Sequence, residues 1–335
     1  MLIDAFLFPY FCPTMSKIGK DILLARQLLI KGELVAIPTE TVYGLAANGL
    51  NADAVLKIYE AKNRPSFNPL ILHAANIQKA KELVSDFPQK ALQLAEKFWP
   101  GPLTLVLRKK NSVPDIVTAG LDTVGVRVPN HPLTLELLAS LDFPLAAPSA
   151  NPSGYVSPTL PQHVAEQLGA RVAYILDGGK CAVGIESTIL KVEDDVITVL
   201  RLGGIELEKI QEITGIPLRH QFHTPDKPES PGMLASHYAP GKKLVLGDIE
   251  ENLRNCTGMK IGVLVFSKSR KDKLPAGAQE LILSSAGDLH EAARNLFSHL
   301  RQLDDSDAEV ILAEPVPDEG LGRAINDRLR RAATK

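Results

Sequence analysis

Apolar and polar residues alternate along the chain with two different periods, which predict helices and strands in succession. Apolar positions three or four residues apart are typical of amphipathic helices, and short apolar runs are typical of buried strands. The expected helices span residues 20–31, 52–61, 77–84, 89–98, 133–141 and 161–168. The expected strands span residues 34–37, 70–73, 103–108, 124–128, 145–147, 172–177, 187–193 and 196–202, the last two forming a hairpin. Because the alternation lacks a strict βα rhythm, we expect a mixed sheet with helices against it.

A change of composition divides the chain. Residues 217–241 contain five prolines and little periodicity, which is typical of a semi-extended linker. Beyond them, strands are expected at 243–246, 260–265 and 310–313, and helices at 290–302 and 324–333, the pattern of a small open α/β domain. A length of 335 residues also favours two domains. We therefore expect a first domain at residues 16–217, a linker at 218–240 and a second domain at 241–335.

The first fourteen residues are apolar, yet they do not have the features of a targeting signal. They lack a basic start and a small-residue cleavage site, and they contain Asp4, Pro9 and Pro13. They are also shorter than the ~20 residues that a membrane span needs. We expect an extension packed on the surface of the domain; alternatively, translation begins at Met15.

Charge and cysteine content exclude several classes of protein. The formal net charge is −2, from 37 Lys and Arg against 39 Asp and Glu, so no permanent polyanionic partner is indicated. Cys12, Cys181 and Cys256 lie far apart and form no CxxC pair. This spacing predicts neither a disulfide framework nor a thiolate zinc site, and it fits a reducing cytoplasm.

Polar residues are concentrated between two apolar runs, from residue 38 to residue 73. No GxxxxGK[ST] loop is present, and the only sequence near GxGxxG, at residues 320–325, lacks its third glycine. If a nucleotide binds, its site must therefore be assembled from side chains and turns. The candidates at the ends of predicted strands are Lys62, Arg64, Asn68, Arg127, Ser149, Ser187, Thr188 and Arg201.

Five short motifs together resemble the YrdC-like domain. They are PTETVYGL, KxRP followed by NPLILH, GVRVP, APSAN and ESTI, in that order. The segments SPGMLASHYAP and GLGRAINDRLRRAA resemble the two-domain members of that family, the threonylcarbamoyl-AMP synthases, so the resemblance covers roughly residues 16–333. It implies a YrdC-like N-terminal domain, with a twisted mixed sheet flanked by helices, and a smaller, Rossmann-like C-terminal α/β domain.

The resemblance implies an enzyme that makes L-threonylcarbamoyl-AMP from L-threonine, bicarbonate and ATP and releases pyrophosphate. Such a product supplies a separate transferase complex, which modifies the adenosine next to the anticodon of tRNA. The resemblance implies no stable binding of nucleic acid and no membrane association. Mg²⁺ is expected to be held chiefly by the phosphates and water, because no carboxylate pair indicates a metal site built by the protein.

The resemblance also implies roles for individual residues. L-threonine would be surrounded by Thr41, His73, Arg127, Ser187 and the backbone at Ala147. The guanidinium of Arg127 offers the two parallel donors that a carboxylate needs. ATP would be contacted by Arg64, Asn68, Thr123, Ser149, Ser157 and Arg201, with Lys62 and Arg64 as the catalytic cations. Tyr238 would reach over the nucleotide, which makes the linker a lid.

Structural interpretations of the same residues stay open. Taken alone, His73 is more typical of a hydrogen-bonded core histidine, and Arg127 of a solvated charge at a strand end. Lys62 and Arg64 could simply be cations at a helix C-terminus, where the helix dipole stabilises positive charge. Ser157 could form a turn. The histidines at 220, 223 and 237 have spacings that fit no common metal site, and we expect them to be solvated.

Two other functions remain as alternatives. One is an RNA-binding module, which would be expected to show a basic surface with aromatic contacts. The other is a relative that adenylates carbamate derived from carbamoyl phosphate; such enzymes usually carry zinc-finger and acylphosphatase segments, which this sequence does not show. A requirement for threonine in pyrophosphate formation would separate the synthase from both.

Overall fold

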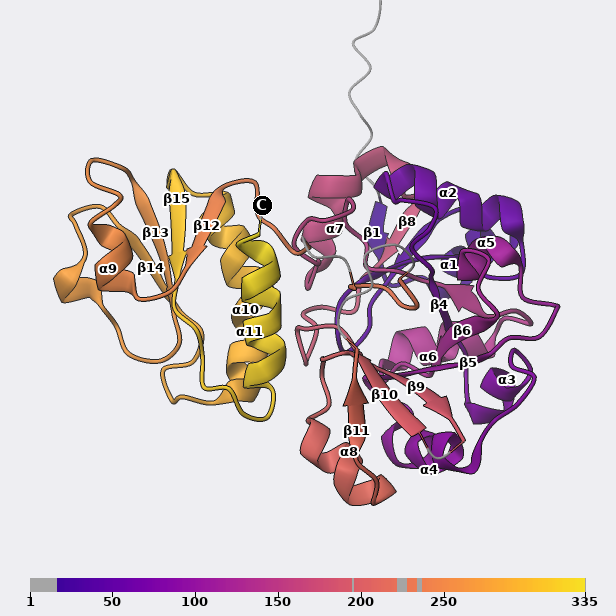
Figure 1. Cartoon of the computed structure of the whole chain (residues 1–335). Coiled ribbons are helices and arrows are strands. Elements are labelled where there is room, and N and C mark those ends of the chain that lie inside the picture. Colours follow the sequence, from indigo (N-terminus) through magenta and orange to yellow (C-terminus); the bar gives the residue numbers. More distant parts are fainter. Residues whose placement is uncertain (1–16, 195, 222–227, 234–236, 335) are drawn as a thin grey trace, which may run out of the picture.

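The computed structural model describes residues 17–194, 196–221, 228–233 and 237–334. The expected N-terminal extension and the alternative start at Met15 lie outside the described residues. The chain forms a larger N-terminal lobe and a smaller C-terminal lobe, each with a sheet of its own (Figure 1).

The N-terminal lobe is organised around a sheet of 11 strands. Its spatial order is β1-β8-β2-β3-β7-β4-β6-β5-β9-β10-β11. Parallel and antiparallel neighbours are mixed: β4 runs parallel to β6, whereas β5 runs antiparallel to it. In chain order the strands are β1 (Lys17–Gly19), β2 (Val35–Ile37), β3 (Gly44–Asn48), β4 (Ile71–His73), β5 (Leu103–Arg108), β6 (Thr123–Arg127), β7 (Leu145–Ala146), β8 (Tyr174–Leu176), β9 (Thr188–Glu193), β10 (Val196–Arg201) and β11 (Leu218–His220).

Helices cover this sheet with their apolar faces. They are α1 (Ile22–Ile30), α2 (Ala52–Lys62), α3 (Ile77–Lys81), α4 (Gln89–Phe98), α5 (Asp115–Thr118), α6 (Pro132–Ala139), α7 (Pro161–Leu168) and α8 (Leu207–Thr214). Asn51 caps the start of α2 through its side chain, and Asn63 ends the helix in the left-handed conformation. These caps fix the end of α2, so that Lys62 lies in its last turn and Arg64 just beyond it.

The C-terminal lobe is a three-layer α/β unit. Its strands β12 (Lys243–Leu246), β13 (Ile261–Val265), β14 (Gln279–Ile282) and β15 (Val310–Ala313) form a fully parallel sheet in the order β12-β15-β13-β14. Helix α9 (Ile249–Leu253) packs on one face, and α10 (Leu289–Asp304) and α11 (Gly322–Ala332) pack on the other. The mixed α/β N-terminal domain and the smaller open α/β domain expected from the sequence are thereby confirmed.

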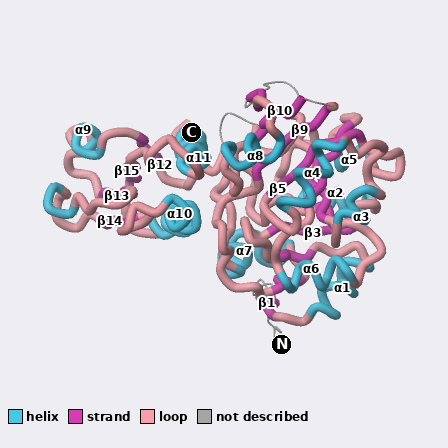
Figure 2. The backbone as a smooth tube through the Cα atoms, turned by 90° about the horizontal axis from the view of Figure 1, so that it is seen from below, coloured by secondary structure: helices cyan, strands magenta, loops and turns pink. Residues whose placement is uncertain are grey.

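Helices α10 and α11 separate the C-terminal sheet from the larger lobe, as both views of the backbone show (Figures 1 and 2). Their apolar side chains form a core that also includes Val42, Val156 and Ile185 of the N-terminal lobe and Tyr238 of the connecting segment. Outside this core, the lobes are joined by hydrogen bonds and ion pairs, such as that between Arg323 and Glu208 at 2.5 Å. The two lobes therefore share one continuous interior.

The connecting segment is partly integrated into the N-terminal lobe. Residues 218–220, expected to belong to the linker, form β11 and pair in parallel with β10. Met233 is buried against Ile71, Val106 and other residues of the sheet. No helix among the described residues is long and apolar enough to cross a membrane.

Candidate active site

Several strands bring polar residues to one edge of the large sheet. Strands β4 and β6 end there, at His73 and Arg127, which are register partners. Strand β9 begins at the same edge next to Ser187, and β10 returns to it at Arg201. Because β4, β6, β5, β9 and β10 are consecutive neighbours in the sheet, residues far apart in sequence line one cleft.

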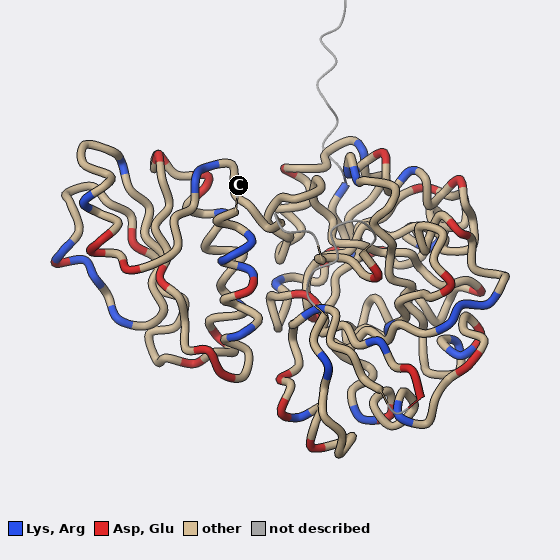
Figure 3. Tube along the Cα trace, in the orientation of Figure 1, with Lys and Arg blue, Asp and Glu red and all other residues tan. Residues whose placement is uncertain are grey.

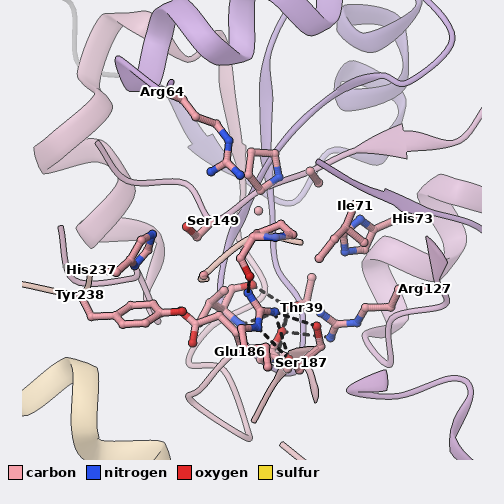
Figure 4. A pocket seen from close by; sticks show the side chains of 18 residues that line it. Thr39, Arg64, Ile71, His73, Arg127, Ser149, Glu186, Ser187, His237 and Tyr238 are labelled. Carbon is pink, nitrogen blue, oxygen red and sulfur yellow. Dashed lines mark hydrogen bonds between the residues drawn. The ribbon is translucent and has the colours of Figure 1, made fainter. Parts of the chain in front are cut away.

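The close-up shows how the cleft is arranged (Figure 4). His73 and Arg127 lie on one side, His237 and Tyr238 lie on the opposite side, and Arg64 points inward from a third direction. The lining residues are Thr39, Thr41, Val42, Gly44, Arg64, Ile71, His73, Arg127, Ala147, Pro148, Ser149, Glu186, Ser187, Arg201, Pro231, Gly232, His237 and Tyr238.

Arg127 is held by a network from the loop after β2. Its Nη2 donates to Thr41 Oγ1 at 3.0 Å and forms an ion pair with Glu40 Oε1 at 2.8 Å, and its Nε donates to the carbonyl oxygen of Gly101 at 3.2 Å. The Thr39 and Thr41 hydroxyls lie 2.8 Å apart, and Thr39 also donates to the carbonyl oxygen of Val42. The guanidinium is thus fixed beside a hydroxyl, an arrangement suited to a small zwitterion with its own hydroxyl.

Ser187 and Arg201 form a second network. Arg201 Nη2 donates to Ser187 Oγ at 3.0 Å, and its Nε and Nη2 both donate to the carbonyl oxygen of Ser187. The Ser187 hydroxyl also lies 2.8 Å from Thr104 Oγ1. Arg201 Nη1 reaches the carbonyl oxygen of Pro231, so the connecting segment is tied directly to this wall of the cleft.

Arg64 and Lys62 are fixed by carbonyl and amide oxygens rather than by carboxylates. Arg64 donates to Asn68 Oδ1 at 2.7 Å and to the carbonyl oxygens of Asn68 and Pro69. Lys62 Nζ donates to the carbonyl oxygens of Ser149 and Asn151, behind the cleft wall. Burial, with Arg64 nearby, lowers the pKa of Lys62 well below its usual value. Burial also lowers the pKa of Arg64, to about 10.

Several buried polar atoms in or beside the cleft have no hydrogen-bond partner among the described residues, and four of them matter most here. They are His73 Nδ1, Asn68 Nδ2, His237 Nδ1 and the Tyr238 hydroxyl. Burial and the adjacent Arg127 lower the pKa of His73 to about 3, so its ring is neutral at physiological pH. Since buried polar groups are nearly always satisfied, a concentration of unsatisfied atoms in one cleft indicates that a polar ligand completes it.

The charge of the cleft is unbalanced in favour of cations. Arg64, Arg127 and Arg201 line it, against the single lining carboxylate of Glu186, and Glu40 lies behind the lining in contact with Arg127. Both carboxylates are already engaged, Glu40 with Arg127 and Glu186 with Arg328. In the part of the chain that the structure describes, no group of three or more His, Cys, Asp or Glu could hold a metal ion. The excess of guanidinium groups therefore fits an anionic ligand.

Nine of the residues expected at the site line the cleft. They are Thr41, Arg64, His73, Arg127, Ala147, Ser149, Ser187, Arg201 and Tyr238. Lys62 and Asn68 lie directly behind this lining and orient it. Ser157 is fully buried and donates to Glu186 Oε1 at 2.5 Å, one step removed from the cavity.

Thr123 is the exception among the expected residues. It begins β6, whereas Arg127 ends that strand, and four residues of extended chain separate their Cα atoms by roughly 13 Å. Thr123 lines a different cavity, with Arg108 and Lys191. The structure therefore does not bring Thr123 into the cleft, and the direct contact with ATP expected from the resemblance has no support in this geometry.

Three cleft features were missed in the sequence. His237 was expected to be solvated, but only 8% of it is exposed and its ring packs against Tyr238 at a centroid distance of 4.1 Å. Glu186, part of the ESTI motif, bridges Ser157 and Arg328. Gly203 passes so close to residues 186–188 that a Cβ there would overlap their backbone. For His237, the sequence signal that could have predicted its burial was its position next to Tyr238 in the SHYAP segment.

Comparison with known proteins agrees with this arrangement. A family model described as telomere recombination matches residues 27–203, and one described as the threonylcarbamoyl-AMP synthase C-terminal domain matches residues 205–334. The threonylcarbamoyl-AMP synthase of Bacillus subtilis is 43% identical over 334 residues, which cover 95% of this chain and 94% of the relative. The chain belongs to the threonylcarbamoyl-AMP synthase family.

Other members of the threonylcarbamoyl-AMP synthase family support the same placement. The synthase of Pyrococcus abyssi is 41% identical over 92% of this chain and 93% of its own length. The crystal structure of P. abyssi Sua5 complexed with L-threonine superposes with a TM-score of 0.88, over 96% of this chain and 97% of that chain. The likeness to this synthase therefore extends through both lobes.

Proposed function

We propose that the cleft makes L-threonylcarbamoyl-AMP from L-threonine, bicarbonate and ATP, with release of pyrophosphate. The observation that carries the proposal is the convergence of Arg127, Thr41 and Ser187 with Arg64 and Arg201 in one cavity. The first three suit an amino acid that has a hydroxyl, and the two remaining cations suit a phosphate chain. The P. abyssi relative with L-threonine supports the same assignment.

Arg127 would bind the threonine carboxylate, and the hydroxyls of Thr41 and Ser187 would face the polar groups of the substrate. A site built to pair a hydroxyl rejects analogues that lack it, because its own buried polar groups are then left unpaired. The neutral ring of His73 adds a donor or an acceptor without another charge. We therefore expect threonine to be preferred over valine and alanine.

The chemistry needs charge neutralisation and alignment rather than a covalent nucleophile. Bicarbonate takes up a proton and loses water to give carbon dioxide. The neutral threonine amine forms a bond to that carbon dioxide and loses a proton, which gives a carbamate. A carbamate oxygen then attacks the α-phosphorus of ATP, the bond from that phosphorus to the bridging oxygen breaks, and pyrophosphate leaves. Arg64 and Arg201 would offset the negative charge of the phosphates, while Lys62 holds the loop that carries Ser149.

The size of the cavity supports a movement of the connecting segment when substrates enter. The cavity has a volume of about 50 Å³ in this structure, whereas pockets for ligands of nucleotide size measure roughly 300–1,000 Å³. Tyr238, His237, Pro231 and Gly232 form the wall that belongs to this segment. We propose that they act as a lid, which excludes water from a carbamate and a mixed anhydride once the substrates are bound.

Several expectations from the sequence belong to the same proposal. Mg²⁺ would enter with ATP and be held by phosphates and water, because the carboxylates of Glu186 in the cleft and Glu40 beside it are both engaged. The product would pass to a transferase complex acting on tRNA, and the proposed location is the cytoplasm. Lys and Arg are intermixed with Asp and Glu in both lobes, which gives no support to an RNA-binding function (Figure 3). The domain boundaries at residues 217 and 241 also remain proposals.

The decisive experiment measures pyrophosphate release with ATP, Mg²⁺, labelled bicarbonate and one amino acid at a time. We expect release and a labelled adenylate with threonine, and neither with valine or alanine. Arg127→Met should abolish both, whereas a substitution of the exposed Arg330 should leave them unchanged. Pyrophosphate release that ignores the omission of threonine would refute the proposal.

Carbamoyl phosphate serves as a second arm of this experiment. Pyrophosphate formation that requires carbamoyl phosphate and not threonine would favour the rival transferase. Salt-sensitive RNA binding without any turnover would favour the RNA-binding module instead.

A further inference from the structure

Arg328 of helix α11 is a buried cation that the proposed chemistry does not use. It belongs to the C-terminal lobe, yet its side chain is fully buried and is directed at the N-terminal lobe. Apolar neighbours such as Leu321, Ile325 and Leu329 already pack α11 into the shared core. Anchoring the helix therefore does not require an ionic group at this position.

Among the described residues, the hydrogen bonds and the ring contact of Arg328 outside its own helix fall on cleft residues or immediately beside one. Its Nε donates to Glu186 Oε2 at 3.0 Å, and Glu186 directly precedes Ser187. Its Nη2 donates to the carbonyl oxygen of Leu202 at 2.8 Å, directly after Arg201. Its guanidinium carbon lies 4.9 Å from the centroid of the Tyr238 ring, in cation–π contact with the lid.

Glu186 also connects Arg328 to the loop that carries Ser157. Its other carboxylate oxygen accepts from Ser157 Oγ, so the carboxylate links the 152–157 loop to α11. Arg328 is itself oriented by Asp327, whose carboxylate lies 2.8 Å from Nη1. Removing the guanidinium would leave Glu186 buried without its cation, and Tyr238 would lose its cation–π contact while keeping its stacking on Phe297 and its edge contact with His237.

The planar fork of arginine is needed for this geometry. Three partners in different directions require N–H groups on three separate nitrogens of a flat cation, whereas a lysine ammonium carries all its N–H groups on one nitrogen. Burial lowers the pKa of Arg328, but Tyr238, Glu186 and Asp327 together raise it by more, so the group stays charged.

We propose that Arg328 is a positioning residue, through which the C-terminal lobe sets the geometry of the cleft. It fixes Ser187 through Glu186, Arg201 through Leu202, and the lid through the Tyr238 ring. This inference rests on the proposed function, because it assigns to the second lobe a part in the same reaction.

The test compares Arg328→Met and Arg328→Lys with Arg323→Met. Arg323 is a matched control: it belongs to the same helix and pairs across the lobes with Glu208, but it does not line the cleft. We expect Arg328→Met to lower kcat at least tenfold and to raise the KM for ATP, with Arg328→Lys intermediate and the control within twofold of wild type. Activity of Arg328→Met equal to that of the control would overturn the inference.

Hydrogen exchange separates positioning from a general loss of stability. In Arg328→Met, we expect faster exchange at the amides of residues 187–188 and 202–204, with protection retained in β13 and β15. Uniform loss of protection across both lobes would mean a purely structural role and would also overturn the inference.

If Arg328→Met does not fold, Glu186→Gln and Arg328→Lys can be combined in a double-mutant cycle. Additive effects on kcat would then refute the coupling. Failure of the proposed function is distinguishable, because wild type itself would then release no pyrophosphate with threonine.

Discussion

Gly203→Ala provides a sharp test of how closely the cleft depends on backbone packing. The new Cβ would lie under 3.0 Å from backbone atoms of Glu186, Ser187 and Thr188, whereas ordinary van der Waals contact begins at 3.4 Å. Main-chain atoms cannot rotate away, so the segment must shift by at least 0.4 Å, the difference between the two values. A misplacement of 1 Å can lower the rate of an enzyme by ~10²-fold. With the logarithm of the rate taken as proportional to the displacement, this shift lowers kcat about sixfold or more.

The assay is the threonine-dependent release of pyrophosphate, measured alongside thermal unfolding. We expect a stability loss of about 1–3 kcal/mol from overpacking, together with the fall in kcat. Gly262→Ala is the control, because its Cβ would meet the flexible end of Leu303 at 3.1 Å, far from the cleft. A Gly203→Ala enzyme that folds and keeps wild-type kcat would show that the position of Ser187 does not govern the reaction.

Three further predictions concern the lid, the charge of the cleft and its histidine. Tyr238→Phe keeps the stacking on Phe297 and loses only the hydroxyl, so we expect the KM for ATP to rise about three- to tenfold; an unchanged KM would exclude a contact of the hydroxyl with the nucleotide. MgATP at a hundred times its Kd should stabilise wild type by about 2.7 kcal/mol, visible as a higher Tm, and Arg64→Met should reduce that shift; an equal shift in both proteins would contradict the cationic site. His73 has a pKa near 3 when folded and an ordinary value of 6.5 when unfolded, so the unfolded chain binds the extra proton between these values and stability falls as pH drops below 6.5. His73→Gln should make that fall shallower in denaturant titrations at pH 5 and pH 7, and an unaltered slope would mean that His73 is not buried in its neutral form.

Much of the fold could be predicted because its elements carry strong local patterns. The helix expected at residues 89–98 and the strand at 103–108 have those bounds in the structure. Strand β3, by contrast, lies within the PTETVYGLAAN motif, whose Gly44 and two adjacent alanines give no strand period. Its position depends on pairing with β2 and β7, which are contacts that a local pattern cannot show.

The candidate site divides in a similar way. Arg127 and Ser187 could be placed because each stands at a strand end, and strand ends meet at one edge of a sheet. Thr123 lies outside the cleft because a strand has two ends and only one of them faces it, so its contact with ATP stays a prediction. The burial of His237 depends on folding back of the connecting segment, and Arg328 reaches Glu186 across 142 positions of sequence. Neither is visible in a local window of residues.

The order of residues along the chain gives the contacts of Arg328 a consequence for protein synthesis. A ribosome joins Thr41, Arg127, Ser187, Arg201 and Tyr238 long before it reaches α11. Until then, the nascent polypeptide carries the Glu186 carboxylate without the guanidinium that later neutralises it. A stop codon ahead of α11 would therefore leave every cleft-lining side chain encoded and the Glu186 carboxylate without this partner.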